Sequence, residues 1–202
     1  AAEPVAHRDP ALGLTAPADS PVEVAVAAIE WGAYLGAEGL ENGVDVCVSS
    51  WQRVAPNTIP SGAKAGGTYL SSQLISMEAK RLGFAEGIGL TTDGMVGEGA
   101  GENLFLVKDG RLLTPPAASS ILAGITRDTV MKLAREEMGL ETIERSIDRS
   151  EVYVSDEAFL TGTGVQIAAI IQVEHRPIGT GGMGPVVMRL REVYFDVAKG
   201  RN

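Results

Sequence analysis

Apolar positions recur along the chain with two spacings, one typical of β-strands and one typical of helices. Apolar runs rich in β-branched residues begin near Pro21, and the runs at 22–29 and 44–48 predict strands buried on both faces. Further strands are predicted at 87–90, 95–97, 103–107, 111–114, 142–147, 158–161 and 167–173. Helices are predicted at 68–82, at 126–138 and from Pro185 onward.

Glycine marks where several of these elements turn or end. Asp93-Gly94 and Asp109-Gly110 are typical of hairpin turns, so the strands between 87 and 114 are predicted to form a meander. Gly83 and Gly139 are predicted to end the first two helices. The helix at 68–82 is predicted to be amphipathic, with one apolar face made by Leu70, Leu74, Met77 and Leu82.

Composition limits the class of protein. With 202 residues and 45% hydrophobic content, the chain is expected to bury one core, or a main domain with a small appendage. A net charge of -9 and a pI near 4.8 argue against nucleic acid and anionic membranes as partners, because both repel an acidic surface. No apolar run reaches membrane-spanning length and no signal-peptide centre is found, so we expect a cytoplasmic location.

The first twenty residues are rich in alanine and proline and lack periodicity. We interpret residues 1–20 as a linker or a severed end, ahead of a domain at 21–202. The single cysteine, Cys47, lies in a strand-like run and is expected to be a small buried residue rather than a nucleophile. The two histidines have no cysteine or carboxylate at ligand spacing, so no metal site is predicted.

Lys64 is the strongest candidate for chemistry. The chain has five lysines, and this one is surrounded by very small uncharged residues, Ser61-Gly62-Ala63-Lys64-Ala65-Gly66-Gly67. Small neighbours let a bound molecule approach the backbone, and a desolvated amine is readily deprotonated and can attack a carbonyl. The alternative is a lysine that falls by chance in a glycine-rich loop.

Two other segments could bind an anion. The helix predicted after Gly124 would direct the backbone N–H groups of Ile125 and Thr126 at a phosphate, although Thr126 could simply cap that helix. A loop of small residues, 161–164, offers the Thr163 hydroxyl at the end of a strand, although a simple turn would explain it equally well.

Glu98 lies among glycine and alanine residues that are too small to screen its carboxylate. It is either a solvated strand end or a carboxylate that reaches a cationic nitrogen in a tight pocket. An imine-forming lysine, a phosphate seat and a carboxylate for a pyridinium nitrogen are together what a pyridoxal 5′-phosphate enzyme needs. Their joint occurrence favours this cofactor.

These residues carry a resemblance to a known family. Glu98-x-Ala100-x-x-Asn103-Leu104-Phe105, with Leu112-x-Thr114 and Leu122-x-Gly124-Ile125-x-Arg127, resembles the signature of class IV pyridoxal phosphate aminotransferases. Further segments, from about Pro21 to the C-terminus, are similar to the branched-chain amino acid aminotransferases: 31–36, Ser49-Ser50-Trp51, 56–60, 63–69, 124–128 and 184–186.

The resemblance implies a role for each matching cofactor residue. Lys64 matches the lysine that bonds to the cofactor and then moves the substrate's α-proton. Tyr69 matches the tyrosine that binds the cofactor's phenolic oxygen, and Glu98 matches the carboxylate that keeps the pyridine nitrogen protonated. The remaining matches bind the phosphate or pack on the ring: Ile125, Thr126, Thr163 and Leu122.

The resemblance also implies substrates, fold and assembly. Trp31 and Tyr34 match residues that line an apolar substrate pocket, while Gly101 and Gly164 match positions beside the substrate. The expected reaction exchanges an amino group between leucine, isoleucine or valine and 2-oxoglutarate. The expected fold is the α/β large domain of fold-type IV enzymes, with a curved, barrel-like sheet flanked by helices, and a homodimer or higher homo-oligomer is expected.

The chain departs from the family in two ways. The smaller front domain of family members has no counterpart in this sequence, and Gly162-Thr163-Gly164-Val165-Gln166 replaces the more usual Gly-Thr-Ala-Ala-Glu. Three alternatives stay open at this point. They are a cofactor-binding chain that needs a separate small domain, a D-amino acid aminotransferase and an aminodeoxychorismate lyase.

Overall fold

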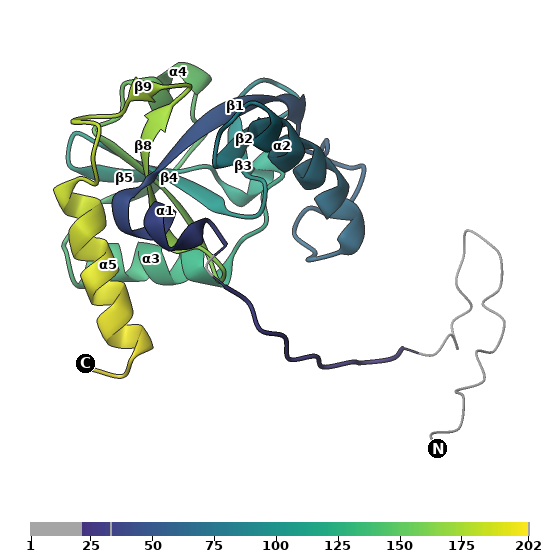
Figure 1. Ribbon diagram of the computed structural model, residues 1–202, viewed down its shortest axis with the longest axis horizontal. Helices are drawn as coiled ribbons and strands as arrows, with labels where there is room; N and C mark the ends of the chain where they lie inside the picture. The colour runs from purple at the N-terminus through teal and green to yellow at the C-terminus, as the bar shows by residue number, and fades with distance from the viewer. Residues whose placement is uncertain (1–21, 33, 202) are drawn as a thin grey trace, which may run out of the picture. The chain divides into compact units, whose positions relative to one another are not determined.

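The computed structural model describes residues 22–32 and 34–201 (Figure 1). The chain divides into two units, Ala1–Trp31 and Gly32–Asn202. In the first unit, residues 22–31 form neither helix nor strand. The strand predicted at 22–29 is therefore wrong, because no strand in the described part of the chain pairs with it. Its large apolar side chains, Val22, Val24, Val26 and Ile29, are 72% to 96% exposed. The linker predicted at 1–20 lies outside the described residues and stays a prediction.

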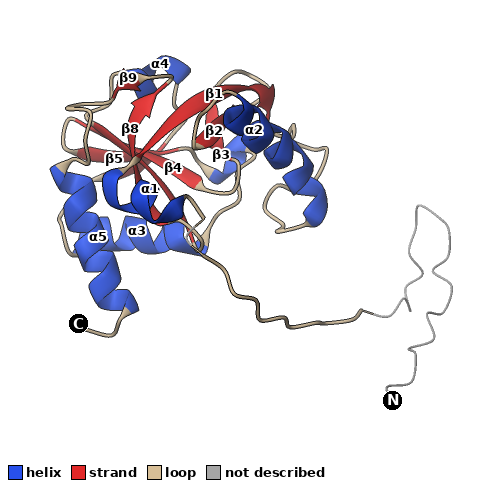
Figure 2. Ribbon diagram, in the orientation of Figure 1, coloured by secondary structure: helices blue, strands red, loops and turns tan. Residues whose placement is uncertain are grey.

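The second unit is built on one sheet with helices packed on it (Figure 2). The strands are β1 (Val44–Gln52), β2 (Glu86–Leu90), β3 (Val96–Gly99), β4 (Asn103–Lys108), β5 (Arg111–Thr114), β6 (Thr142–Glu144), β7 (Glu157–Gly162), β8 (Gln166–Val173) and β9 (Arg176–Pro177). The helices are α1 (Gly36–Asn42), α2 (Tyr69–Arg81), α3 (Ile125–Glu136), α4 (Arg149–Tyr153) and α5 (Pro185–Ala198), with short 3-10 turns at Gly66–Thr68 and Ala117–Ser119.

The strand order is β3-β2-β1-β8-β7-β4-β5-β6, with β9 beside β8. β1 pairs in parallel with β2 on one side and with β8 on the other, and β5 pairs in parallel with β6. The Asp-Gly turns do form the hairpins β2–β3 and β4–β5. The predicted continuous meander is wrong, because β1, β8 and β7 lie between the two hairpins. A local turn sequence predicts which strands pair through it, but not which hairpins become neighbours.

The sheet curls until its distant parts meet. The backbone N–H of Val96, at the start of β3, donates to the carbonyl of Ile147, just beyond β6, at 2.9 Å. Met95 and Asp148 also form an isolated bridge. The curled sheet flanked by helices confirms the predicted fold class.

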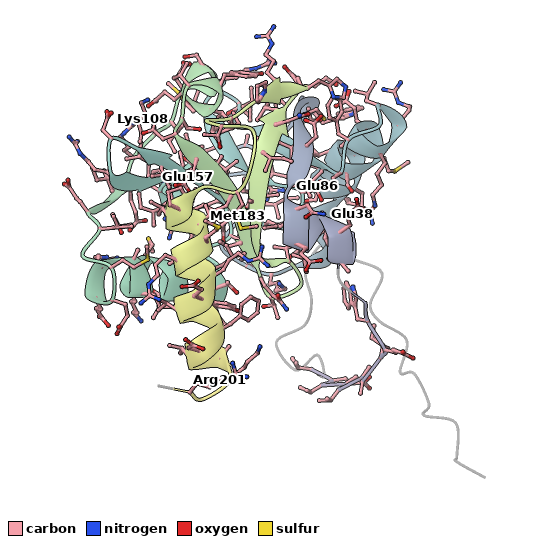
Figure 3. All side chains as sticks on the ribbon, turned by 60° about the vertical axis from the view of Figure 1, so that its left-hand side comes forward. Glu38, Glu86, Lys108, Glu157, Met183 and Arg201 are labelled. Carbon is pink, nitrogen blue, oxygen red and sulfur yellow. The ribbon has the colours of Figure 1, made fainter. Side chains whose placement is uncertain are left out.

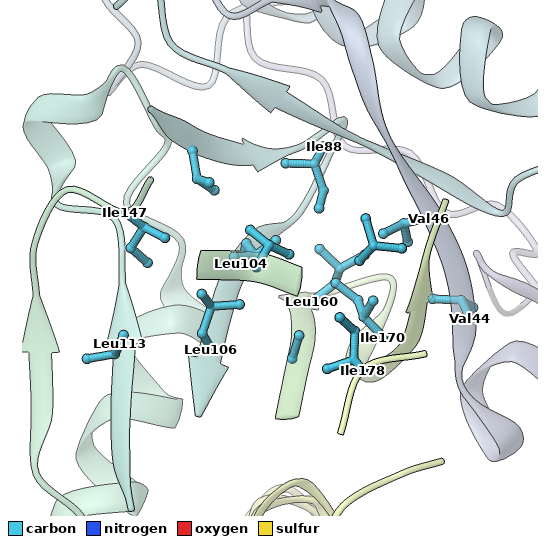
Figure 4. Close-up of a cluster of buried hydrophobic side chains, with 14 residues drawn as sticks. Val44, Val46, Ile88, Leu104, Leu106, Leu113, Ile147, Leu160, Ile170 and Ile178 are labelled. Atoms are coloured by element: carbon cyan, nitrogen blue, oxygen red, sulfur yellow. The ribbon is translucent and has the colours of Figure 1, made fainter. Parts of the chain in front are cut away.

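Alternation along the strands gives the sheet two apolar faces. On β4, Leu104 and Leu106 face the core enclosed by the curled sheet (Figure 4), whereas Phe105 packs in the core beneath α3 and α5. Phe105 stacks on Phe159 of β7 with ring centroids 5.0 Å apart. The predicted burial of Cys47 is confirmed, and this burial raises the pKa of its thiol to about 11.

α2 packs on β1 and β2, but not through its predicted apolar face. Its buried residues are Ser72, Ile75 and Ala79, whereas Leu70, Leu74, Met77 and Leu82 are exposed. The reason lies in β2, where a Cβ on Gly87 or Gly89 would lie 2.7 Å from the side chain of Ile75. Glycine at these two positions of β2 leaves room for Ile75, so the face of α2 that carries Ser72, Ile75 and Ala79 packs on the sheet.

Buried or hydrogen-bonded carboxylates fasten two helices to the sheet. Glu78 of α2 accepts from Ser50 N at 2.8 Å and Ser50 Oγ at 2.6 Å, beyond the middle of β1. Glu157, at the start of β7, accepts from Val186 N at 2.9 Å and Val187 N at 2.8 Å in the first turn of α5 (Figure 3). Glu157 supplies partners to N–H groups in the first turn of α5, whereas Glu78 ties α2 to a backbone N–H and a hydroxyl of β1. Within the described residues, no helix combines the length and apolarity needed to cross a membrane.

Candidate active site

A cleft of about 240 Å³ opens between the start of α2, the start of α3 and the loops after β3 and β7. It brings together all seven residues predicted for the cofactor site and one residue predicted to lie beside the substrate, Gly101, although they come from distant parts of the sequence. Those that line it are Lys64, Tyr69, Glu98, Gly101, Leu122, Ile125, Thr126 and Thr163.

Glu98 is a carboxylate buried in the wall of this cleft. It lies on β3, and its side chain forms an ion pair with Arg53, Oε1 to Nη2, at 2.6 Å. Asn103 Nδ2 donates to Oε2 at 3.1 Å, and the backbone N–H of Leu122 donates to the same oxygen at 3.1 Å. Burial raises the pKa of Glu98 to about 7, and the positive charge of Arg53 acts in the opposite direction. The solvated strand end considered above is therefore excluded.

The start of α3 has free backbone donors. Its first turn follows Gly124, which makes no side-chain cap, and the backbone N–H of Gly124 donates to Asn103 Oδ1 at 3.2 Å. Thr126 lies inside the helix rather than at the capping position, so the alternative that it merely caps α3 is wrong. Ile125 and Thr126 line the cleft at the start of α3, the positive end of the helix dipole.

Lys64 lies in an exposed loop along the cleft. The expectation that its amine is desolvated is wrong for this structure. Lys64 and its small neighbours from Gly62 to Gly67 are all exposed. What the structure does provide is access, because Lys64 and Glu98 line the same cleft.

Unlike the predicted cofactor residues, the predicted substrate residues do not all line the cleft. Gly101 lines the cleft, whereas Tyr34 and Gly164 do not. These two lie against each other, since a Cβ on Gly164 would be 3.7 Å from Cβ of Tyr34. Burial raises the pKa of the Tyr34 phenol to about 12, and the negative charges of Glu86 and Glu102 add to the effect. Trp31 ends the first unit, where its side chain is 69% exposed.

Four residues of the site were missed by the sequence analysis. Arg53 and Ser72 line the cleft behind Glu98, and the pattern gave only one weak signal for them, a lone arginine directly after a strand. Asn103 was part of the matched signature but had no assigned role. Glu102 is a buried acid in the cleft wall that accepts from Gly101 N at 3.0 Å.

Comparison with known proteins agrees with this arrangement. Residues 2–173 match the family "Amino-transferase class IV". The branched-chain-amino-acid aminotransferase of Escherichia coli strain K12 is 50% identical over 192 residues, which cover 95% of this chain and 62% of that protein. The chain therefore spans less than two thirds of the length of this relative.

Solved structures show the same relationship. A crystal structure of the Escherichia coli branched-chain amino acid aminotransferase matches with a TM-score of 0.91 and 51% identity, covering 94% of this chain and 62% of that one. The branched-chain amino acid aminotransferase of Thermobaculum terrenum in PLP-form matches with a TM-score of 0.77 and 43% identity, covering 79% of this chain and 52% of that one. From the family match over most of its length and the cleft that its residues form, this chain belongs to the class IV aminotransferase family.

Proposed function

We propose that this chain is the large domain of a branched-chain amino acid aminotransferase and binds pyridoxal 5′-phosphate. The proposed reaction exchanges an amino group between leucine, isoleucine or valine and 2-oxoglutarate. The observation that carries the proposal is Glu98, a buried carboxylate held by three donors in the wall of the cleft that Lys64 also lines.

The residues of the cleft fit this cofactor. A carboxylate has about four acceptor positions, so Glu98 keeps capacity for one more donor beyond Arg53, Asn103 and Leu122. The uncapped start of α3 suits a phosphate, because its N–H groups lack side-chain partners. One cleft therefore contains the amine of Lys64, an acceptor for a ring nitrogen on Glu98 and an anion-binding site at the start of α3.

The proposed roles follow from this chemistry. When bound, pyridoxal 5′-phosphate supplies an electron-withdrawing ring that stabilises negative charge at the α-carbon of the amino acid. Lys64 Nζ would take the proton from that α-carbon and return it, and Glu98 would accept a hydrogen bond from the ring nitrogen. Ile125 and Thr126 would hold the phosphate through their backbone N–H groups, with Thr163 adding a hydroxyl. Tyr69 would bind the phenolic oxygen, and Leu122 would pack on the ring.

The substrate assignment rests on resemblance to branched-chain enzymes. Gly101 would lie beside the substrate, and we retain Trp31, Tyr34 and Gly164 as proposed substrate contacts from the matched motifs. D-amino acid aminotransferase and aminodeoxychorismate lyase are disfavoured, because the relatives with 50% identity bear the branched-chain name. A cytoplasmic location stays part of this proposal.

An assay with the purified chain and added cofactor tests the function. The chain is incubated with leucine, isoleucine or valine and 2-oxoglutarate, and in parallel with D-alanine or aminodeoxychorismate. Formation of branched-chain 2-oxo acids supports the proposal, and turnover of D-alanine alone would contradict it. Cofactor absorbance without turnover supports a chain that needs a separate small domain, which is then supplied as a second polypeptide.

A further inference from the structure

Arg53 reaches the cleft through a passage lined by glycine. It follows β1 directly, its backbone N–H donates to Leu90 O at 2.8 Å, and the residue is only 5% exposed. A Cβ on Gly89 would lie 3.1 Å from its Cδ, and one on Gly97 would lie 3.1 Å from its Cγ. The stem of Arg53 therefore passes where β2 and β3 carry no side chains.

The guanidinium at the end of this stem has two fixed partners. Nη1 donates to Ser72 Oγ of α2 at 2.7 Å, and Nη2 is 2.6 Å from Glu98 Oε1. Gly89 is also the residue that pairs with Glu98 across β2 and β3. One side chain thus connects the end of β1, the packed face of α2 and the carboxylate of β3. This geometry is specific to arginine, because its planar group places two donors at a fixed separation.

The charges around Glu98 leave Arg53 as its main counter-ion. Burial opposes ionisation of Glu98, and the ion pair with Arg53 opposes that effect more strongly than Arg127, which acts from α3. Glu102 is a second acid buried in the cleft wall, and the negative charge of Glu98 contributes to raising the pKa of Glu102. Without Arg53, the carboxyl would face a second buried acid with only distant positive charge.

We propose that Arg53 is a positioning residue that favours ionisation of Glu98 and directs its carboxylate into the cleft, and that Gly89 and Gly97 are required because they admit the side chain of Arg53. The consequence for the cofactor rests on the proposed function, whereas the effect of Arg53 on Glu98 does not. The ionised form of Glu98, which the charge of Arg53 favours against the effect of burial, is what would hold a proton on a bound ring nitrogen.

The first experiment titrates Glu98 in protein without cofactor. Glutamate is labelled with ¹³C at the side-chain carboxyl, and the Glu98 resonance is assigned by its loss in Glu98→Gln. In Arg53→Met, which keeps the stem and removes the charge, the midpoint should rise by about 1–3 pH units. In Arg53→Lys, the Glu98 midpoint should return most of the way to that of the unaltered chain, because the positive charge is present again. An unchanged midpoint in Arg53→Met would overturn the proposal.

The glycine passage supplies a second test that preserves every charge. A Cβ at position 89 would lie 2.7 Å from Ile75 Cδ1 and 3.1 Å from Arg53 Cδ, so Gly89→Ala should displace the Arg53 stem as well as Ile75 and raise the Glu98 midpoint in the same direction as Arg53→Met. Gly182→Ala is the matched control, because nothing lies within 4 Å of a Cβ at that position. If Arg53→Met fails to fold, Gly89→Ala and Arg53→Lys still test the proposal. An unchanged Glu98 midpoint in Gly89→Ala would show that Gly89 is not required to admit the Arg53 side chain.

A third measurement separates this inference from the proposed function. Binding of pyridoxal 5′-phosphate is followed at several pH values, and Arg53→Met should weaken it about tenfold or more at neutral pH, with recovery in Arg53→Lys. If the unaltered chain binds no cofactor but its Glu98 midpoint depends on Arg53, the proposed function fails and the pairing stands. If cofactor binds equally well to the unaltered chain and to Arg53→Met, and the Glu98 midpoint is the same in both, the inference about Arg53 fails while the proposed function stands.

Discussion

The side-chain amide of Asn103 joins Glu98 to the start of α3, since Nδ2 donates to Glu98 Oε2 at 3.1 Å while Oδ1 accepts from Gly124 N at 3.2 Å. The same Nδ2 also donates to Leu122 O at 2.7 Å. A single residue of β4 therefore sets the distance between the Glu98 carboxylate and the proposed phosphate-binding site at the start of α3.

Replacing Asn103 by leucine should destabilise the chain and weaken cofactor binding together. The change leaves the Gly124 N–H and the Leu122 carbonyl without their partner, which costs about 1–3 kcal/mol. Denaturant unfolding and a cofactor titration measure the two effects. Asn103→Asp is the matched variant, because it keeps the acceptor for Gly124 and loses both donors. Full stability in Asn103→Leu would show that these hydrogen bonds are replaceable.

Borohydride reduction in the presence of cofactor should attach a pyridoxyl group to the peptide that contains Lys64. The reason is that Lys64 lines the cleft with Glu98, whereas Lys80 and Lys132 do not. Peptide mass spectrometry locates the label, and Lys64→Ala should abolish it while Lys80→Ala leaves it intact. Labelling centred on Lys80 or Lys132 would remove Lys64 from the proposed mechanism.

Glu98→Gln should retain cofactor but slow removal of the α-proton by roughly two orders of magnitude or more, because a neutral amide does not hold a proton on the ring nitrogen. Single-turnover absorbance with leucine measures the rate. Glu136→Gln, an exposed change on α3, controls for the loss of one negative charge. An unaltered single-turnover rate in Glu98→Gln would mean that another group supports the ring.

The protein should be most stable in weakly acidic solution. Burial raises the pKa of Glu98 to about 7 and also raises those of Glu86 and Glu102, so the folded chain retains protons that the unfolded chain loses. The stabilisation is fully present below the unfolded value near 4.5 and is lost as the pH rises through neutrality. Unfolding in denaturant between pH 5 and pH 9 measures this slope.

In Glu102→Gln, the free energy of unfolding lost between pH 5 and pH 9 should be smaller by on the order of 1 kcal/mol or more, since one pKa unit corresponds to about 1.4 kcal/mol. Glu137→Gln, which is exposed, should leave it unchanged. In stronger acid the trend should reverse, because hydrogen bonds lower the pKa of Glu78 and Asp148. An equal slope in Glu102→Gln and the unaltered chain would show that this acid is not proton-linked to folding.

Self-association should depend on the outer face of α2. We propose a homodimer or higher homo-oligomer, and the exposed apolar side chains there, such as Leu74 and Met77, support it. Sedimentation should show that Leu74→Glu with Met77→Glu shifts the chain toward monomer, whereas Gln73→Glu on the same helix does not. If the unaltered chain sediments as a monomer at all concentrations, the proposed homo-oligomer is contradicted.

Periodicity predicted the strands β1 to β8 and the helices α2, α3 and α5 of the second unit, although it gave the wrong buried face for α2. It failed for α1 and α4, which have only 7 and 5 residues. The start of α4 nevertheless carries a readable signal, the capping box of Asp148 and Glu151. The buried face of α2 could not be predicted, because Gly87 and Gly89 on another element select it.

The candidate site was predictable where one residue has a distinctive neighbourhood, as for Lys64 and Glu98. It was not predictable where function depends on a partner brought by the fold. Arg53 looks like an ordinary polar residue after a strand, and only the curled sheet places its charge against Glu98. The exposure of Lys64 depends likewise on which segments cover its loop.

The parallel pairing of β1 with β8 has a consequence for the order of folding. Val44 pairs with Ile170, so the central ladder joins residues far apart in sequence, whereas the two hairpins close through short turns. Closing the longer loop carries the larger entropy cost and is expected to be slow. Because the cleft contains residues from Arg53 to Thr163, it is complete only when this late step has occurred. A cofactor that needs the assembled cleft would therefore slow unfolding rather than accelerate folding.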